Sequence, residues 1–132
     1  MNHPVPAHWV RPHHVRTTRQ AFLQHWVFGS FQADLAIDPR RYRTHGLPTG
    51  ASGQVFLHDA LRGDAADPLS GDLGRLLQGK APQAHAAAKA APHAMLIRGE
   101  LDDPADLGYL RDLIGFIACL LDNGGVAALD VQ

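Results

Sequence analysis

The sequence predicts a single α+β domain, a two-layer fold with about four mostly antiparallel strands and helices on one face. Its 132 residues are the length of one domain. Its hydrophobic fraction of 45% and charged fraction of 19% are typical of a globular protein. Segments with strand-like and helix-like spacing alternate along the chain, and the C-terminal part reads as strand, helix and strand. A ferredoxin-like arrangement is one option for this order.

The N-terminal segment predicts an extended arm. Residues 1–14 contain Pro4, Pro6 and Pro12 together with four histidines. Proline at this density prevents a helix or a central strand. We therefore expect an arm over residues 1–14 and one α+β domain over residues 15–132.

Two elements are expected next. Thr17 or Thr18 can cap a helix that runs to about Phe28, because its apolar residues approximate a helical face. Residues 31–37 then alternate between apolar and polar side chains, which predicts a half-buried strand.

The middle of the chain has weaker signals. Residues 38–53 contain Gly and Pro at several positions and predict a loop. A short apolar run predicts a strand over residues 54–58. Leucines at helical spacing predict a helix around residues 68–78, and the alanine-rich segment from Pro82 to Ala91 predicts another.

The C-terminal part has the clearest signals. Residues 94–97 predict a buried strand. Asp103 and Pro104 begin a predicted helix. Its expected buried stripe comprises Leu107, Leu110, Ile114, Ile117 and Leu121, widened by Leu113 and Leu120. Residues 123–125, Asn-Gly-Gly, end the helix, and residues 126–131 predict a final strand. Because the chain stops beside this apolar strand, we expect either an edge strand or a piece of a longer protein.

Charge and composition restrict the partners and the cellular compartment that we expect for this chain. Residues 1–50 carry a net charge of +4 and residues 51–132 a net charge of −5. The overall pI of about 6.7 argues against a nucleic-acid partner. The chain has neither a signal-peptide pattern nor an apolar run long enough for a membrane span. Arg and Asp dominate the charged residues, as in proteins from GC-rich bacterial genomes. We expect a cytoplasmic bacterial protein without a membrane partner.

Few residues show the spacing of a catalytic, ligand-binding or metal-binding motif. His58 and Asp59 follow a predicted strand and are weak catalytic candidates. Arg41, Arg43 and His45 precede a glycine-containing loop and are weak ligand-binding candidates. No pair among the nine histidines has the i, i+4 spacing of a helical metal site, so we expect no metal. No nucleotide-binding motif is present, and we expect no cofactor.

The final helix suggests a packing surface. Gly108, Gly115 and Cys119 form a line of small residues that would let another backbone approach closely. The opposite charges of the two halves and the terminal apolar strand also suit self-association. We therefore expect a non-enzymatic binding or interaction module that forms a dimer. The alternative is a small metal-binding protein or hydrolase that uses His45, His58 and Asp59.

Overall fold

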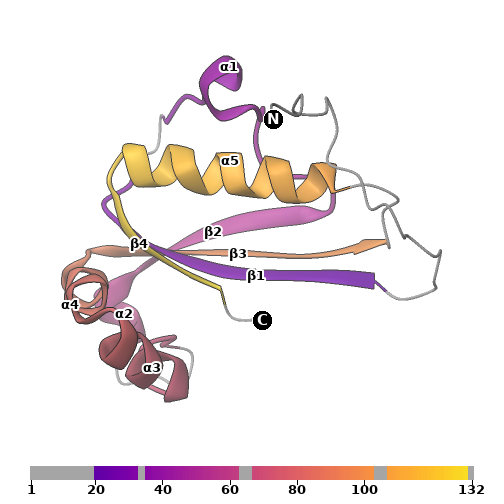
Figure 1. Cartoon of the computed structure of the whole chain (residues 1–132). Helices are drawn as coiled ribbons and strands as arrows, with labels where there is room; N and C mark the ends of the chain where they lie inside the picture. The colour runs from indigo at the N-terminus through magenta and orange to yellow at the C-terminus, as the bar shows by residue number, and fades with distance from the viewer. Residues whose placement is uncertain (1–19, 33–34, 63–66, 103–106, 131–132) are drawn as a thin grey trace, which may run out of the picture.

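The fold is seen in a computed structural model that describes residues 20–32, 35–62, 67–102 and 107–130. The arm predicted over residues 1–14 lies outside these ranges, as does the helix start predicted at Asp103 and Pro104. Figure 1 shows a central sheet with helices on both sides of it.

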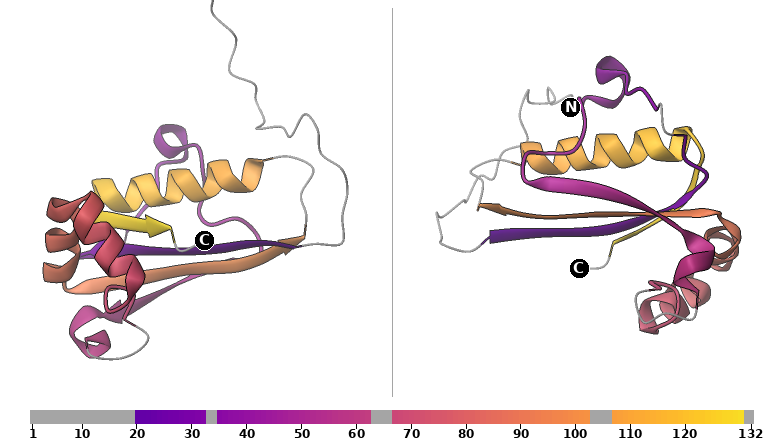
Figure 2. Two further views of the ribbon diagram at one scale, coloured as in Figure 1. Left: turned by 60° about the horizontal axis from the view of Figure 1, so that its bottom comes forward. Right: turned by 180° about the vertical axis from the view of Figure 1, so that it is seen from behind.

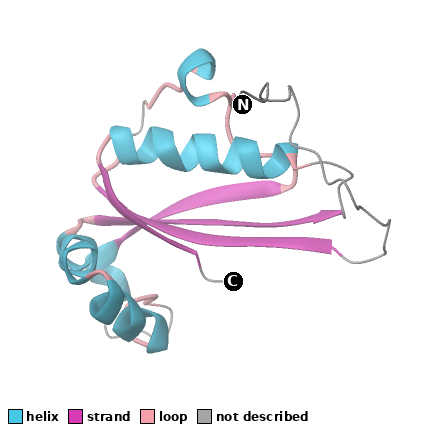
Figure 3. Cartoon of the chain, viewed as in Figure 1, coloured by secondary structure: helices cyan, strands magenta, loops and turns pink. Residues whose placement is uncertain are grey.

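Four strands form one sheet (Figure 3). In chain order they are β1 (Gln20–Gly29), β2 (Ala51–Leu57), β3 (His93–Asp102) and β4 (Gly125–Asp130). Across the sheet the order is β2-β3-β1-β4, so β1 and β3 are central while β2 and β4 are edges. Every neighbouring pair is antiparallel. The predicted α+β class with four antiparallel strands is confirmed.

The helices differ from the prediction in their distribution. In the described ranges they are α1 (Pro39–Tyr42), α2 (His58–Leu61), α3 (Asp72–Lys80), α4 (Pro82–Ala90) and α5 (Gly108–Asp122). Helix α5 covers one face of the sheet with α1 beyond it, whereas α2, α3 and α4 gather at one end on the other side (Figure 2). We expected helices on one face only. The second group lies opposite because Leu61 and Ala88 pack against sheet side chains that point away from α5.

The ferredoxin-like option is matched in one half of the fold. Such domains have the element order βαββαβ. Strand β3, helix α5 and strand β4 have the required form. Among the described residues, the connection from β1 to β2 holds only the four-residue α1, and three helices lie between β2 and β3.

The helix predicted up to Phe28 is wrong, because residues 20–29 form β1. Both faces of this central strand are covered at its C-terminal end, where Trp26, Val27 and Phe28 are all buried. A strand buried on both faces loses its period-2 pattern. The aromatic and β-branched residues nevertheless favour a strand over a helix.

The strand predicted over residues 31–37 is also wrong within the described residues, which form no strand there. The amide of Phe31 donates to Nδ1 of His93, at 3.1 Å, and the two rings stack with centroids 6.2 Å apart. Phe31 and Leu35 pack against the core beneath α5. The alternation therefore reflects a loop that packs on one side, without a strand partner.

The loop predicted over residues 38–53 is wrong in part, because it contains α1 and the first residues of β2. The other predicted strands and helices match with shifted ends. The predicted strands at 54–58, 94–97 and 126–131 correspond to β2, β3 and β4, and β3 is longer than its apolar run. The predicted helices at 68–78 and 82–91 correspond to α3 and α4. Helix α5 extends to Asp122, one residue before the predicted Asn-Gly-Gly stop.

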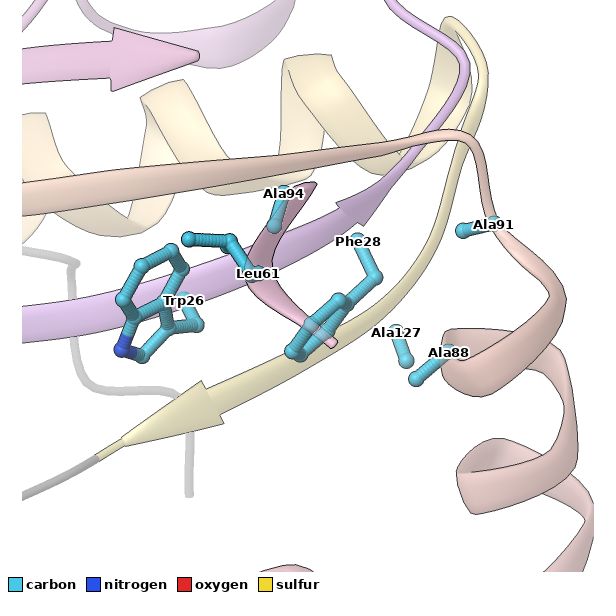
Figure 4. Packing of buried hydrophobic residues seen from close by; sticks show 7 residues of the cluster. All are labelled: Trp26, Phe28, Leu61, Ala88, Ala91, Ala94 and Ala127. Carbon is cyan, nitrogen blue, oxygen red and sulfur yellow. The ribbon is translucent and has the colours of Figure 1, made fainter. Parts of the chain in front are cut away.

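Two cores lie on opposite faces of the sheet. On the α5 side, Leu23, Val27 and Ile97 of the sheet pack against Leu113 and Leu120. On the other side, the residues drawn in Figure 4 form a second cluster: Trp26, Phe28, Leu61, Ala88, Ala91, Ala94 and Ala127. The second core is rich in alanine, which lets α4 approach the sheet closely.

The buried stripe of α5 is rotated from the one we expected. Leu113 and Leu120, which we expected only to widen the stripe, are buried in the core. Ile114 is 52% exposed and Leu121 is also exposed. Because Ile and Leu occur on most sides of this helix, spacing alone did not identify the side that meets the sheet.

Gly115, in the middle of α5, is in close contact with another segment of the same chain. A Cβ added at Gly115 would lie 2.2 Å from the carbonyl oxygen of Tyr42 and 2.9 Å from Cγ2 of Thr44. Gly115 therefore lets α1 and the residues that follow it dock on α5. This contact compensates for the low helix propensity of glycine at this position.

Substituting Gly115 by alanine should lower the free energy of unfolding by about 1–3 kcal/mol, as for other overpacked sites. The backbone of Tyr42 cannot move away as a flexible side chain could. The matched control is Gly79→Ala in α3, where an added Cβ has no heavy atom within 4 Å. That change should be neutral or stabilise by up to about 1 kcal/mol. Urea denaturation of both variants checks this, and equal stabilities would contradict the close contact.

Candidate functional site

His58 is the first residue of α2 and is almost fully buried, with 1% of its surface exposed. Its Nδ1 lies 2.9 Å from the carbonyl oxygen of Ala91. Because a carbonyl only accepts, Nδ1 carries the hydrogen and donates it. The ring also packs against Phe28, with centroids 5.4 Å apart. These contacts hold the imidazole at the end of the sheet in one orientation.

Asp59 does not share that environment. Its carboxylate is exposed, and Oδ1 lies 3.5 Å from Nη1 of Arg62. Asp59 therefore lies in solvent and outside any apolar pocket. His58 and Asp59 are adjacent in the sequence, but the side chain of His58 is buried and that of Asp59 is in solvent.

Arg41 contributes to the docking of α1. Its Nη2 lies 3.4 Å from Oδ2 of Asp122, and its guanidinium lies 5.4 Å from the centre of the Tyr42 ring. The hydroxyl of Tyr42 donates to the same carboxylate oxygen at 2.8 Å. This hydrogen bond raises the pKa of Tyr42, with a smaller contribution from desolvation. The ion pair joins a cation of the basic half to an anion of the acidic half within one chain.

The other two predicted ligand-binding residues lie in the segment that follows. Arg43 is exposed and has a left-handed backbone conformation with φ of 56°. His45 is exposed in the loop beyond it. The structure brings neither side chain into the two cavities described below.

His45 and the His58–Asp59 pair are on opposite sides of the sheet. The segment with His45 follows α1 on the α5 side, whereas α2 begins at His58 on the other side (Figure 1). Among the residues that the structure describes, no group of three His, Cys, Asp or Glu side chains could hold a metal ion. The alternative of a metal-binding protein or hydrolase built on His45, His58 and Asp59 gains no support from this geometry.

Cys119 is buried in α5. Burial raises the pKa of its thiol, although a hydrogen bond from Asn123 acts in the opposite direction. A reactive cysteine requires a stabilised thiolate. Cys119 therefore acts as a packing residue within the core of the chain.

Two cavities were not predicted from the sequence. One has a volume of about 380 Å³ and lies between the loop after β1, strands β2 and β3, and α5. Its lining is almost entirely apolar and includes Phe31, Leu35, Val55, Met95 and Phe116. The second, of about 420 Å³, lies among α2, α3 and α4 and has His58 in its wall. Their linings come from segments distant in sequence, so no local motif could reveal them.

Three large apolar side chains of α5 and β4 are exposed. Val126 is 49% exposed at the register shift between β1 and β4, where it lines a small cavity together with Ala87 and Ala90 of α4. Helix residues are about 100° apart. Ile114 and Leu121 therefore share one side of α5, roughly opposite Phe116, which faces the cavity beside β2. We call Ile114, Leu121 and Val126 the β4–α5 flank.

In the described part of the chain, no helix has the length and apolar character needed to cross a membrane. Comparison of the chain with protein-family models, with curated proteins and with solved structures found no match.

Proposed function

We propose that this chain is a non-enzymatic interaction module that self-associates by antiparallel pairing of β4 with β4 of a second copy. The observation that carries the proposal is an edge strand beside the exposed β4–α5 flank. The bacterial cytoplasm is the proposed setting, supported by the Arg- and Asp-rich composition and by the buried free thiol of Cys119.

The edge of β4 supports this pairing. Within the described residues β4 pairs only with β1, so its other side presents backbone N–H and C=O groups without a strand partner. Proteins commonly protect such edges with charged residues or proline. From Gly125 to Leu129 β4 has neither, and Asp130 is its first charged residue.

The flank supplies the apolar contact. Pairing of two identical antiparallel edges generates two-fold symmetry, in which the same surface of each copy meets the other. It would bring the two α5 helices side by side and place the β4–α5 flanks of both copies together. Burial of large apolar side chains is the main favourable contribution to such an interface.

Two features that favoured a dimer in the sequence, the small residues of α5 and the oppositely charged halves, make contacts within the chain. The small residue Gly115 already accommodates Tyr42 and Thr44 of the same chain. Arg41 of the basic half already pairs with Asp122 of the acidic half. The proposal therefore rests on β4 and its flank alone.

Sedimentation equilibrium over a range of protein concentrations tests the proposal. We expect a mass twice the 14.3 kDa of the chain. Val126→Lys should raise the dissociation constant about 100-fold or more, because it places like charges across the two-fold axis. The matched control is Val55→Lys on the other edge strand, β2, where Val55 is 46% exposed. It should leave association unchanged.

Three results would contradict this interface. The first is a wild-type chain that sediments at 14.3 kDa at every concentration. Alternatively, Val55→Lys would dissociate the dimer while Val126→Lys did not, which would assign the contact to β2. Equal effects of both lysines would indicate nonspecific association. Circular dichroism of both variants verifies that each remains folded.

A further inference from the structure

The cavity among α2, α3 and α4 has both cationic and hydrogen-bonding side chains in its wall. Its volume of about 420 Å³ is within the range of small-molecule sites. The polar side chains of its wall are His58, Arg62, Asp67, Ser70, Gln78, His85 and Lys89. They include two permanent cations and one carboxylate, together with two imidazoles.

The cations come from two different elements. His85 and Lys89 are four residues apart on α4, which puts them on the same side of that helix. In the described part of the chain no carboxylate lies within 4 Å of the Lys89 ammonium. Arg62 reaches the cavity from the end of α2, and its Nη2 donates to the backbone carbonyl of Lys89 at 2.6 Å. The Arg62 guanidinium is therefore held beside α4.

Among the described residues, two carboxylates lie in or beside the cavity wall. Oδ1 of Asp67 accepts a hydrogen bond from the backbone N–H of Leu69 at 2.9 Å. The carboxylate of Asp59, which does not line the cavity, lies 3.5 Å from Arg62 and is exposed to water. Neither carboxylate neutralises Lys89.

His58 gives the cavity a preorganised wall. Its ring is buried, and its Nδ1 is bonded to Ala91, so the imidazole cannot turn away from the cavity. Fixed polar groups in a partly enclosed site lose little entropy when a ligand binds. The sequence singled out His58, but its partners Arg62, His85 and Lys89 come together only in the fold.

We infer that this cavity binds a small metabolite through a phosphate group. A tetrahedral phosphate accepts hydrogen bonds from several directions, which suits donors on separate helices, whereas a planar carboxylate accepts them near one plane. Charge-assisted hydrogen bonds from Arg and Lys to phosphate are among the strongest in proteins. The cavity is larger than one phosphate ion, so the remaining space would hold the body of the metabolite.

Nuclear magnetic resonance titration of the full chain with inorganic phosphate tests this inference, with chloride at equal ionic strength as the reference. We expect saturable shifts at the amides of Ser70, Gln78 and Lys89. Lys89→Gln should weaken phosphate binding about 10-fold or more, because it removes one charge-assisted donor. Lys80→Gln at the end of α3 is the matched control, since Lys80 lies outside the cavity wall and the charge change is the same. It should alter the affinity less than about 2-fold.

Other outcomes would overturn the inference. One such outcome is that phosphate causes no saturable shift. Another is that the two lysine variants weaken binding equally, as expected for nonspecific attraction. Saturable binding of acetate without binding of phosphate would assign the cavity to carboxylates instead. The test is independent of the proposed dimer, because Val126→Lys should leave phosphate binding unchanged.

Discussion

Replacing Phe28 by alanine should lower the free energy of unfolding by about 3–5 kcal/mol, the usual cost of truncating a buried phenylalanine. Phe28 is fully buried on the central strand β1. Its ring lies between Trp26, with centroids 6.4 Å apart, and His58. The alanines around Phe28 have short side chains, which cannot fill the cavity that truncation would leave. Truncation would therefore remove the largest fully buried side chain of this core and loosen His58 as well.

Phe22→Ala is the matched control for this prediction. Phe22 lies on the same strand and the same face of the sheet, but 59% of its surface is exposed. Its truncation should cost less than about 1 kcal/mol. Urea denaturation of both variants at the same low protein concentration compares their stabilities with little contribution from self-association. Similar losses would mean that the alanine-rich core does not depend on Phe28.

Leu120→Ala should cost about 2–5 kcal/mol, because Leu120 is fully buried between α5 and the sheet. Ile114→Ala should cost less than about 1 kcal/mol, because Ile114 is 52% exposed on the β4–α5 flank. The sequence alone predicted burial of Ile114, so this pair tests which side of α5 meets the sheet. Thermal or urea unfolding of dilute protein measures both changes.

The two variants also separate stability from association. Ile114→Ala should weaken the proposed dimer while leaving the unfolding of dilute protein nearly unchanged. Leu120→Ala should destabilise the chain at every concentration. A large loss of stability in Ile114→Ala at low concentration would contradict the exposure of its side chain.

The candidate site was only partly predictable. His58 was singled out because a polar residue follows an apolar strand, and the structure does place it in the wall of a cavity. Arg41 was singled out by local charge, but it holds α1 against Asp122. Arg62, His85 and Lys89 had no local signal, because α2 and α4 meet only after the chain folds.

The sequence by itself determined the elements that depend on local chemistry. The Asn-Gly-Gly stop, the proline at the start of α4 and the apolar run within β3 act through backbone preferences and short-range spacing, so α4, α5 and β3 were predicted. Tertiary structure decided the rest. Residues 20–29 form a strand because β3 and β4 flank them and helices cover both faces, and burial on both faces removes the alternation that identifies a strand. The orientation of α5 and the docking of α1 at Gly115 likewise depend on contacts between distant segments, since hydrophobic burial is non-directional and local spacing leaves several helix faces equally apolar.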